Sequence, residues 1–153
     1  AGLPNQQPET RGSTMLKHTG RLNISAGLAV MAAFMAYGFL LIYLRDFAPG
    51  KADWIASYST GKHFESRLAH VHGNLFALLN ILFGYLILKL PVTGQMAKWS
   101  SWLALAGLLM PLGIIGEVYL GLPPVFVFAG AVSMIAAVLV LSAAVLRQSG
   151  AAA

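Results

Sequence analysis

Four long apolar runs decide what this chain can fold into. They cover Leu22 to Leu44, Leu68 to Leu88, Trp99 to Leu120 and Val125 to Leu146. A helix rises about 1.5 Å per residue, so roughly 20 residues cross a hydrocarbon layer about 30 Å thick, and each run is long enough. Inside a bilayer every backbone N–H and C=O must be paired within the protein, and these uniform runs lack the alternation of a β-barrel strand. The sequence therefore predicts four transmembrane helices.

The composition agrees with lipid as the surrounding solvent. Of the 153 residues, 58% are hydrophobic and 10% are charged, whereas about a quarter of the residues are charged in an average soluble domain. The net charge of +5 does not indicate nucleic acid as a partner, because the charged residues flank the apolar runs, which is a membrane pattern. The sequence has no cysteine, which excludes disulfides, thiolate metal sites and cysteine nucleophiles.

The links between the runs predict the arrangement of the helices. Short connections make sequential helices antiparallel neighbours, so we expect an all-α integral membrane four-helix bundle. The transmembrane domain covers residues 22–147. It lies between a flexible N-terminal tail and juxtamembrane segment, residues 1–21, and a C-terminal tail, residues 148–153. The longest connection is a loop from Arg45 to Arg67, and the last is a tight turn at 121–124.

The distribution of basic residues predicts the orientation in the membrane. Six of the ten Lys and Arg residues lie on the side of the two termini and of the link near Pro91, and the other four lie on the side of the first loop. Lys and Arg are more frequent in cytoplasmic segments. We therefore expect both termini in the cytoplasm and the protein in a plasma or inner membrane.

Small residues and one proline predict how the helices pack and bend. Small residues at spacings of three or four let helix backbones approach closely, within the chain or between copies. They recur in the first and fourth runs, at Ala29, Ala33, Ala36, Ala129, Ser133 and Ala137. Pro111 has no N–H to pair with the carbonyl of Gly107, so the third helix should be kinked there.

Six polar side chains lie within the apolar runs and are the candidates for function. Burying an ionisable group in hydrocarbon costs several kcal/mol on most scales, so each should face protein, water or a metal. The candidates are His70, His72, Asn74 and Asn80 in the second run and Glu117 and Tyr119 in the third. The second helix starts, and the third ends, on the side of the first loop. The two histidines, Glu117 and Tyr119 should therefore share one depth.

The two histidines should point to opposite faces of their helix. At about 100° per residue, positions 70 and 72 differ by about 200°. One stripe is polar and cationic and holds His63, Arg67, His70 and Asn74, provided that the helix starts early enough to include His63. The other stripe is aromatic and holds His72, Phe76, Leu79 and Phe83. We therefore expect the two histidines to have different roles.

The aromatic stripe predicts a haem site. A neutral imidazole in an apolar aromatic wall is suited to axial ligation of haem iron, and a nearby Arg can pair with a propionate. We therefore expect haem as the cofactor, with His72 or His70 as the iron ligand. Arg67, Phe76 and Asn74 are the further candidates for cofactor binding.

Two other interpretations of these residues stay open. His63, Glu65 and His70 with Glu117 could bind a hard or borderline divalent ion, although no HExxH motif or pair of carboxylates on a helix supports such a site. The two histidines could also only hydrogen-bond neighbouring helices or a carbonyl. Hydrolase and nucleotide chemistry have no visible basis, because the sequence lacks a glycine-rich phosphate loop and a G-x-S-x-G motif.

The segment RLAHVHGNLFALLN, residues 67–80, carries resemblances to known families. Its H-x-H pair followed by Asn74 and Leu75, at the head of a transmembrane helix, resembles small four-helix membrane proteins related to subunit I of haem-copper oxidases. In that superfamily an H-x-H pair on one helix serves two haems on opposite faces. This resemblance implies haem binding by His70 and His72.

The chain also resembles styrene oxide isomerase, a short four-helix membrane enzyme that binds haem b at the interface of a trimer and rearranges an epoxide to an aldehyde. The shared features are the size, the helix count, an Arg, His and Gly that open the second helix, a later Asn and a Tyr late in the third helix. The resemblance implies that one of the two histidines ligates iron and that Tyr119, with Asn74 or Asn80, holds the substrate oxygen. Aligning the His displaces the Asn, and Glu117, a further catalytic candidate by its depth, has no counterpart.

These observations predict a haem b-binding integral membrane protein with a redox, electron-transfer or oxidase-like role. One alternative is a haem-dependent epoxide isomerase, in which ferric iron with an open position acts as a Lewis acid on a small apolar substrate. Another is an accessory subunit without a cofactor, docked on a larger membrane complex through its small-residue faces. Besides lipid, we expect a second copy or a membrane complex as partner, because four helices alone enclose a macrocycle poorly.

Overall fold

A computed structural model describes residues 11–90, 92 and 94–149 of the chain. The described residues form no strand and six helices, which are α1 (Arg11–Asp46), α2 (Lys51–Ala56), α3 (Gly61–Lys89), α4 (Gly94–Gly107), α5 (Leu109–Leu120) and α6 (Val125–Ser149). Four segments are long and apolar enough to cross a membrane, namely Lys17–Asp46, Gly61–Lys89, Gly94–Leu120 and Val125–Arg147. The predicted all-α four-helix membrane bundle is confirmed.

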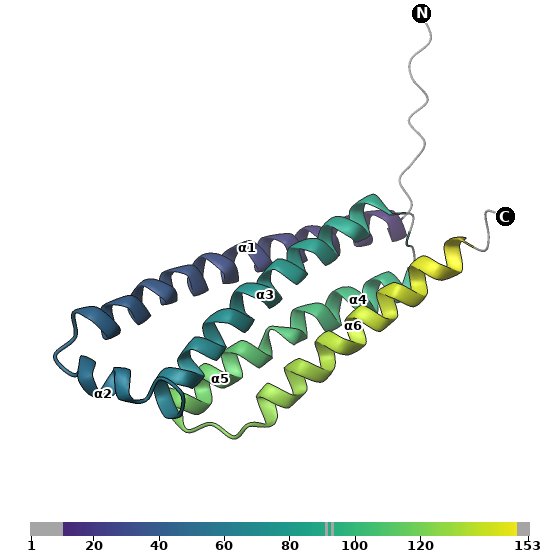
Figure 1. The fold of residues 1–153 in the computed structure, drawn as a ribbon. Helices are drawn as coiled ribbons and strands as arrows, with labels where there is room; N and C mark the ends of the chain where they lie inside the picture. Colours follow the sequence, from purple (N-terminus) through teal and green to yellow (C-terminus); the bar gives the residue numbers. More distant parts are fainter. Residues whose placement is uncertain (1–10, 91, 93, 150–153) are drawn as a thin grey trace, which may run out of the picture.

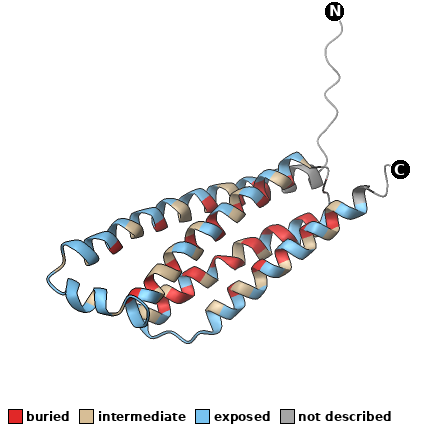
Figure 2. Cartoon of the chain, in the orientation of Figure 1, coloured by how far each residue is buried: buried red, intermediate tan, exposed pale blue. Residues whose placement is uncertain are grey.

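The four spans lie alongside one another, with antiparallel neighbours (Figure 1). α1 packs on α3, α6 packs on α4 and α5, and α3 also contacts α4 and α5. α2 lies at the end of the bundle opposite the start of α1 and the end of α6 (Figure 1). Buried residues line the inner sides of the helices (Figure 2), while Phe39, Leu120 and Leu146 on the outside are 74%, 74% and 70% exposed. Such an apolar exterior suits contact with lipid.

Glycines bring α1 and α3 close together. Gly20, Gly27, Phe34 and Leu41 follow one another at intervals of seven residues on α1, and all four are buried. A Cβ added to Gly27 would lie 2.6 Å from the backbone oxygen of Ala77 on α3. Because real Cβ atoms do not approach an oxygen so closely, only glycine permits this spacing of the two backbones.

The sequence predicts a different packing face for α1, formed by its small alanines. Ala29, Ala33 and Ala36 are all exposed, so within the chain α1 packs through the seven-residue repeat instead of through these alanines. The prediction for the fourth run holds in part, because Ala137 is buried there while Ala129 is exposed.

The third span is interrupted where Pro111 predicts it. α4 ends at Gly107 and α5 begins at Leu109. At the junction, the Leu108 N–H donates to the backbone oxygen of Leu105, three residues back, at 3.1 Å. The interruption lies within one turn before Pro111, where the proline ring crowds the preceding turn and the Gly107 carbonyl lacks its helical N–H partner.

The predicted turn after the third span is also present. α5 ends at Leu120, and the next residue, Gly121, has a φ of +66°. The Gly121 N–H donates to the oxygen of Glu117 at 3.2 Å, and the Leu122 N–H donates to the oxygen of Gly116 at 3.1 Å. This pair of bonds closes a helix through a left-handed residue, a position that favours glycine.

The first span starts earlier than the sequence predicts. Residues 11–21 were expected to be tail and juxtamembrane segment, but α1 already includes them. Part of this segment is buried, because Thr19 is 8% exposed and Gly20 lies against Leu88 on α3. Residues 1–10 and 150–153 of the two expected tails lie outside the described residues.

The first loop is shorter than the expected stretch from Arg45 to Arg67. It contains the short helix α2, and α3 begins at Gly61. The early start of α3 is stabilised by burial, because His63 is 4% exposed and Ser66 is 0% exposed. The polar stripe of α3 therefore includes His63, because the helix begins before this residue.

We expect Gly27→Leu to lower the free energy of unfolding by about 1–3 kcal/mol, because an overpacked side chain must push α1 away from Ala77. Denaturant titration of helicity in detergent micelles measures this change. Ala29→Leu is the matched control, since Ala29 is exposed on the same helix, and its effect should be close to zero. Equal losses in both variants would contradict the glycine contact.

Candidate functional site

An apolar groove between α3 and α6 contains one of the two predicted histidines. Its volume is about 430 Å³, within the range of roughly 300–1,000 Å³ that is usual for small-molecule sites. The lining comes from α3, α5 and α6 and consists of His72, Leu75, Phe76, Met110, Ala131, Met134, Ile135, Val138 and Leu139. His72 has the one ionisable side chain in this lining.

The His72 ring is held in one tautomer. Its Nδ1 lies 2.9 Å from the backbone oxygen of Leu68, one turn earlier on α3. A carbonyl oxygen can only accept, so Nδ1 donates, and the neutral ring keeps its lone pair on Nε2. Phe76 meets the ring edge to face, with centroids 6.2 Å apart. A ring fixed through Nδ1 with an available Nε2 is the arrangement that metal-bound histidines use.

His70 lies on the other side of α3, against α1. Its Nδ1 donates to the backbone oxygen of Phe34 at 2.8 Å. The ring fills the space beside Gly38, where an added Cβ would lie 2.6 Å from Cε1 and 3.3 Å from Nε2. The His70 ring therefore packs on the backbone of α1 at this glycine. The prediction that His70 and His72 face opposite sides of one helix is confirmed.

Three hydroxyl groups meet near the α2 end of the bundle. The Tyr119 hydroxyl on α5 lies 2.9 Å from Ser66 Oγ on α3 and 3.2 Å from the Tyr37 hydroxyl on α1. The cluster joins three helices. The Tyr37 ring lies beside His70, with centroids 6.5 Å apart. Glu117 is exposed, and neither Glu117 nor Tyr119 is among the described residues that line the His72 groove.

Asn80 belongs to a buried polar network. Its amide donates to the backbone oxygens of Phe76 at 3.0 Å and Ala104 at 2.9 Å, and its Oδ1 accepts from Asn23 at 2.9 Å. Asn23 also donates to the backbone oxygen of Ser101 at 3.1 Å and accepts from the Ser101 hydroxyl. Both amide side chains are 0% exposed. Asn80 thus joins α1, α3 and α4. Asn74, by contrast, donates only along its own helix, to the His70 backbone oxygen at 2.9 Å.

Arg67 and His63 connect α3 to the segment around α2. The Arg67 guanidinium lies 3.9 Å from the centroid of the Tyr58 ring, a cation–π contact, and donates to the Tyr58 backbone oxygen at 3.4 Å. His63 donates from Nδ1 to the backbone oxygen of Trp54 at 2.8 Å and stacks on the Trp54 ring. Arg67 therefore contacts Tyr58 and does not line the groove of His72.

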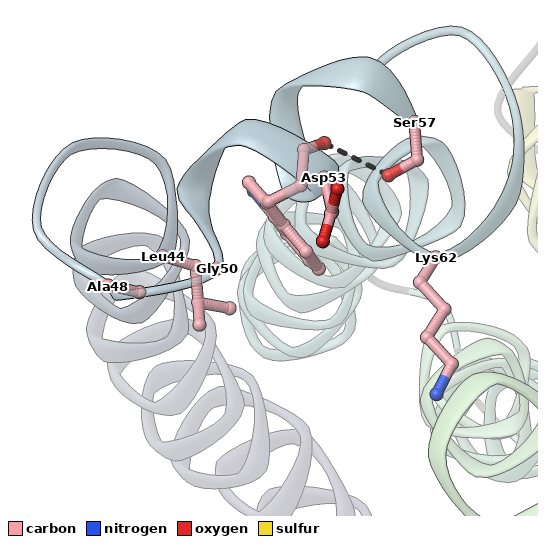
Figure 3. A pocket seen from close by; sticks show the side chains of 7 residues that line it. Leu44, Ala48, Gly50, Asp53, Ser57 and Lys62 are labelled. Carbon is pink, nitrogen blue, oxygen red and sulfur yellow. Dashed lines mark hydrogen bonds between the residues drawn. The ribbon is translucent and has the colours of Figure 1, made fainter.

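A second cavity lies beside α2 (Figure 3). Its volume is about 440 Å³, and its lining is Leu44, Ala48, Gly50, Asp53, Trp54, Ser57 and Lys62. The Ser57 hydroxyl donates to the backbone oxygen of Trp54 at 2.9 Å, the bond that is dashed in Figure 3. The Trp54 Nε1 is buried and has no hydrogen-bond partner among the described residues. None of the predicted site residues lines this cavity.

The alternative of a divalent-ion site is not supported. Among the residues that the structure describes, no three His, Asp or Glu side chains come together as a possible metal group. The structure does not bring His63, Glu65, His70 and Glu117 together as such a group. His63 and His70 are instead bonded to backbone oxygens in two different places.

Four residues with buried or shared polar contacts were missed in the sequence, namely Asn23, Tyr37, Ser66 and Ser101. The signal for two of them was present. Asn23 and Tyr37 lie three residues after Gly20 and Phe34, and so they continue the seven-residue repeat of the buried face of α1. A spacing of three and four along a helix marks one contact face.

We expect Asn80→Ala to lower the free energy of unfolding by about 1–3 kcal/mol, because Asn23 and the Ala104 carbonyl would lose a partner in the interior. Denaturant titration in micelles measures the loss. Asn74→Ala is the control, and its effect should be smaller because the Asn74 side chain bonds only to His70 on the same helix. Two equal losses would argue against a network that joins helices.

We expect Arg67→Ala to speed backbone hydrogen exchange in residues 51–58 several-fold, because the cation–π contact with Tyr58 is removed. Exchange in residues 68–88 of α3 should stay unchanged. Val71→Ala, an exposed residue on α3, is the control and should leave residues 51–58 as they are. Unchanged exchange in the Arg67 variant would show that this contact does not hold α2.

Comparisons of the chain with protein-family models, with curated proteins and with solved structures found no match. The resemblances to haem-copper oxidase relatives and to styrene oxide isomerase therefore remain predictions from the sequence. A function has to be proposed from the contacts of the candidate residues themselves.

Proposed function

We propose that the protein is a haem b-binding membrane protein with a redox or electron-transfer role, and that His72 is the axial ligand. The observation that carries this proposal is the position of the His72 ring. Its Nδ1 is bonded to Leu68, and the ring lines an apolar groove of about 430 Å³. A neutral imidazole with its lone pair on Nε2 is the form that ligates iron.

His72 is favoured over His70 by what surrounds each ring. Both rings donate from Nδ1 to a backbone oxygen. The His70 ring, however, packs on the backbone of α1 beside Gly38, whereas His72 lines an open cavity. We therefore assign the iron to His72 and a role in helix packing to His70.

The groove fits the apolar part of a haem. Apart from His72, its lining offers only hydrocarbon and two thioethers, which suits the edges of a macrocycle. No Lys or Arg is among the described residues that line it, so we expect the propionates at the membrane-surface end of the groove, because carboxylates avoid hydrocarbon. A second copy could cover the rest of the ring, which is the partner we propose besides lipid.

The chain's own residues would tune such a site. Bound haem supplies one-electron chemistry through its iron. The hydrogen bond to Leu68 fixes the orientation of the imidazole and raises its basicity as a ligand. The apolar lining excludes water and lowers the local dielectric constant, and this sets the potential of the iron.

The positions of the other candidates favour a redox role over epoxide isomerisation. An isomerase of the kind considered above needs polar groups beside the iron to hold the substrate oxygen. Tyr119 is bonded to Ser66 and Tyr37, and Asn80 is bonded within the buried network. Neither residue lines the groove of His72.

The test is haem retention in two matched variants of the purified protein. We expect His72→Gly to lose nearly all of its haem b, measured as Soret absorbance per folded protein. Added imidazole should restore the absorbance, because free imidazole can occupy the space of the missing ring. His70→Gly should keep haem, since its ring faces α1. A colourless wild-type protein, or equal retention in the two variants, would overturn the assignment.

A further inference from the structure

We propose that the cavity beside α2 binds the headgroup of phosphatidylethanolamine, with Asp53 on its ammonium group and Lys62 on its phosphate. This inference goes beyond the proposed function and does not depend on haem, because no residue that lines this cavity also lines the groove of His72. The observations that carry it are two opposite charges and a buried N–H donor around a space of about 440 Å³.

The two charged side chains of the cavity have opposite signs and are not paired with each other. Figure 3 shows the Asp53 carboxylate in the middle of the cavity and the Lys62 side chain at its edge. Within the described part of the chain no ion pair joins these two groups, and the ion pair nearby joins Arg45 to Asp46. An anion alone would be repelled by Asp53 and a cation alone by Lys62. The lining therefore favours a zwitterion.

Trp54 adds a hydrogen-bond donor to this lining. Its Nε1 is buried and has no hydrogen-bond partner among the residues that the structure describes. The indole ring is fixed by stacking on His63, with centroids 4.7 Å apart. A buried donor without a partner is unfavourable, and an acceptor bound in the cavity would remove this cost. A phosphate oxygen is such an acceptor.

The cavity lies at the level of the lipid headgroups. Two membrane spans, Lys17–Asp46 and Gly61–Lys89, end beside it, and they contribute Leu44 and Lys62 to its lining. The segment between these spans carries apolar side chains on its outside, since Phe47 is 72% exposed. Exposed aromatic side chains next to charged ones are typical of segments that lie in the membrane interface. The zwitterion that is abundant at this level is a phospholipid.

The chemistry of Asp53 selects ethanolamine among the phospholipid headgroups. A primary ammonium group donates three N–H bonds and forms a charge-assisted hydrogen bond with a carboxylate. The trimethylated nitrogen of choline donates none, and a glycerol headgroup has no positive charge. A lipid that enters at the Lys62 edge with its phosphate brings its ammonium group to Asp53. Leu44 and Ala48, on the far side in Figure 3, then close the cavity with apolar carbon.

The experiment measures lipid binding to the full chain in detergent by native mass spectrometry. Short-chain phosphatidylethanolamine and phosphatidylcholine are the probes. We expect the wild-type protein to bind the ethanolamine lipid about tenfold more tightly, the factor of one charge-assisted hydrogen bond. Asp53→Asn should lose this preference, and Lys62→Gln should weaken the binding of both lipids and keep their ratio. Glu65→Gln is the control, because this carboxylate does not line the cavity.

Trp54→Phe tests the indole donor separately. This variant keeps an aromatic ring and removes the N–H, so we expect several-fold weaker binding of both lipids. Without lipid, its thermal stability should equal that of the wild-type protein, because Nε1 has no partner to lose among the described residues. Unchanged lipid binding, or a loss of stability in the absence of lipid, would overturn the role of Trp54.

The outcomes separate this inference from the proposed function. Equal binding of the two lipids by the wild-type protein, or an unchanged preference in Asp53→Asn, would overturn the site. Competition by free phosphoethanolamine at the concentration at which the lipid binds would overturn the lipid as the source of the zwitterion. Soret absorbance should be the same in all these variants, so a protein without haem contradicts the proposed function and leaves the lipid site standing.

Discussion

In a bilayer the surroundings of a helix are as apolar as its leucines, so the hydrophobic effect does not drive the spans together and close contact between backbones must hold them. Gly27 on α1 provides such contact, because its missing side chain lets α1 reach the backbone of α3 at Ala77. The Asn23 and Asn80 amides add directional bonds in the same interface. Other large side chains of α1, such as Leu28, Met35 and Phe39, then lie on the outside of the bundle.

Much of the fold could be predicted from the sequence, because length, hydropathy and proline chemistry act locally. These features predict the number of spans, the break near Pro111 and the turn at Gly121. The buried face of α1 could not be found from small residues alone, since its alanines outnumber its glycines, and only the partner helix decides which of them it meets. The early start of α3 was missed for a similar reason, because the burial of His63 and Ser66 depends on contacts with other segments.

The candidate site shows the same limit. The helical period alone places His70 and His72 on opposite faces, but it does not say what covers each face. In the structure all three histidines with described contacts donate from Nδ1 to a backbone oxygen. Their rings differ in what lies against them: aromatic side chains for His63, the backbone of α1 for His70 and a groove for His72. The three histidines therefore share the same local hydrogen bond, and only the segments that pack against their rings distinguish their roles.

The break in the third span has a consequence for the second. Because Leu108 turns its N–H to Leu105, the carbonyl of Ala104 accepts a hydrogen bond from the Asn80 side chain on α3. The Asn80 amide of a neighbouring helix thus takes the place that the Leu108 N–H would have at this carbonyl in a regular helix. If the helix continued regularly through Leu108, the Leu108 N–H would compete for the Ala104 carbonyl, and the bond of Asn80 that crosses from α3 to α4 would weaken while its bond to Phe76 within α3 remained.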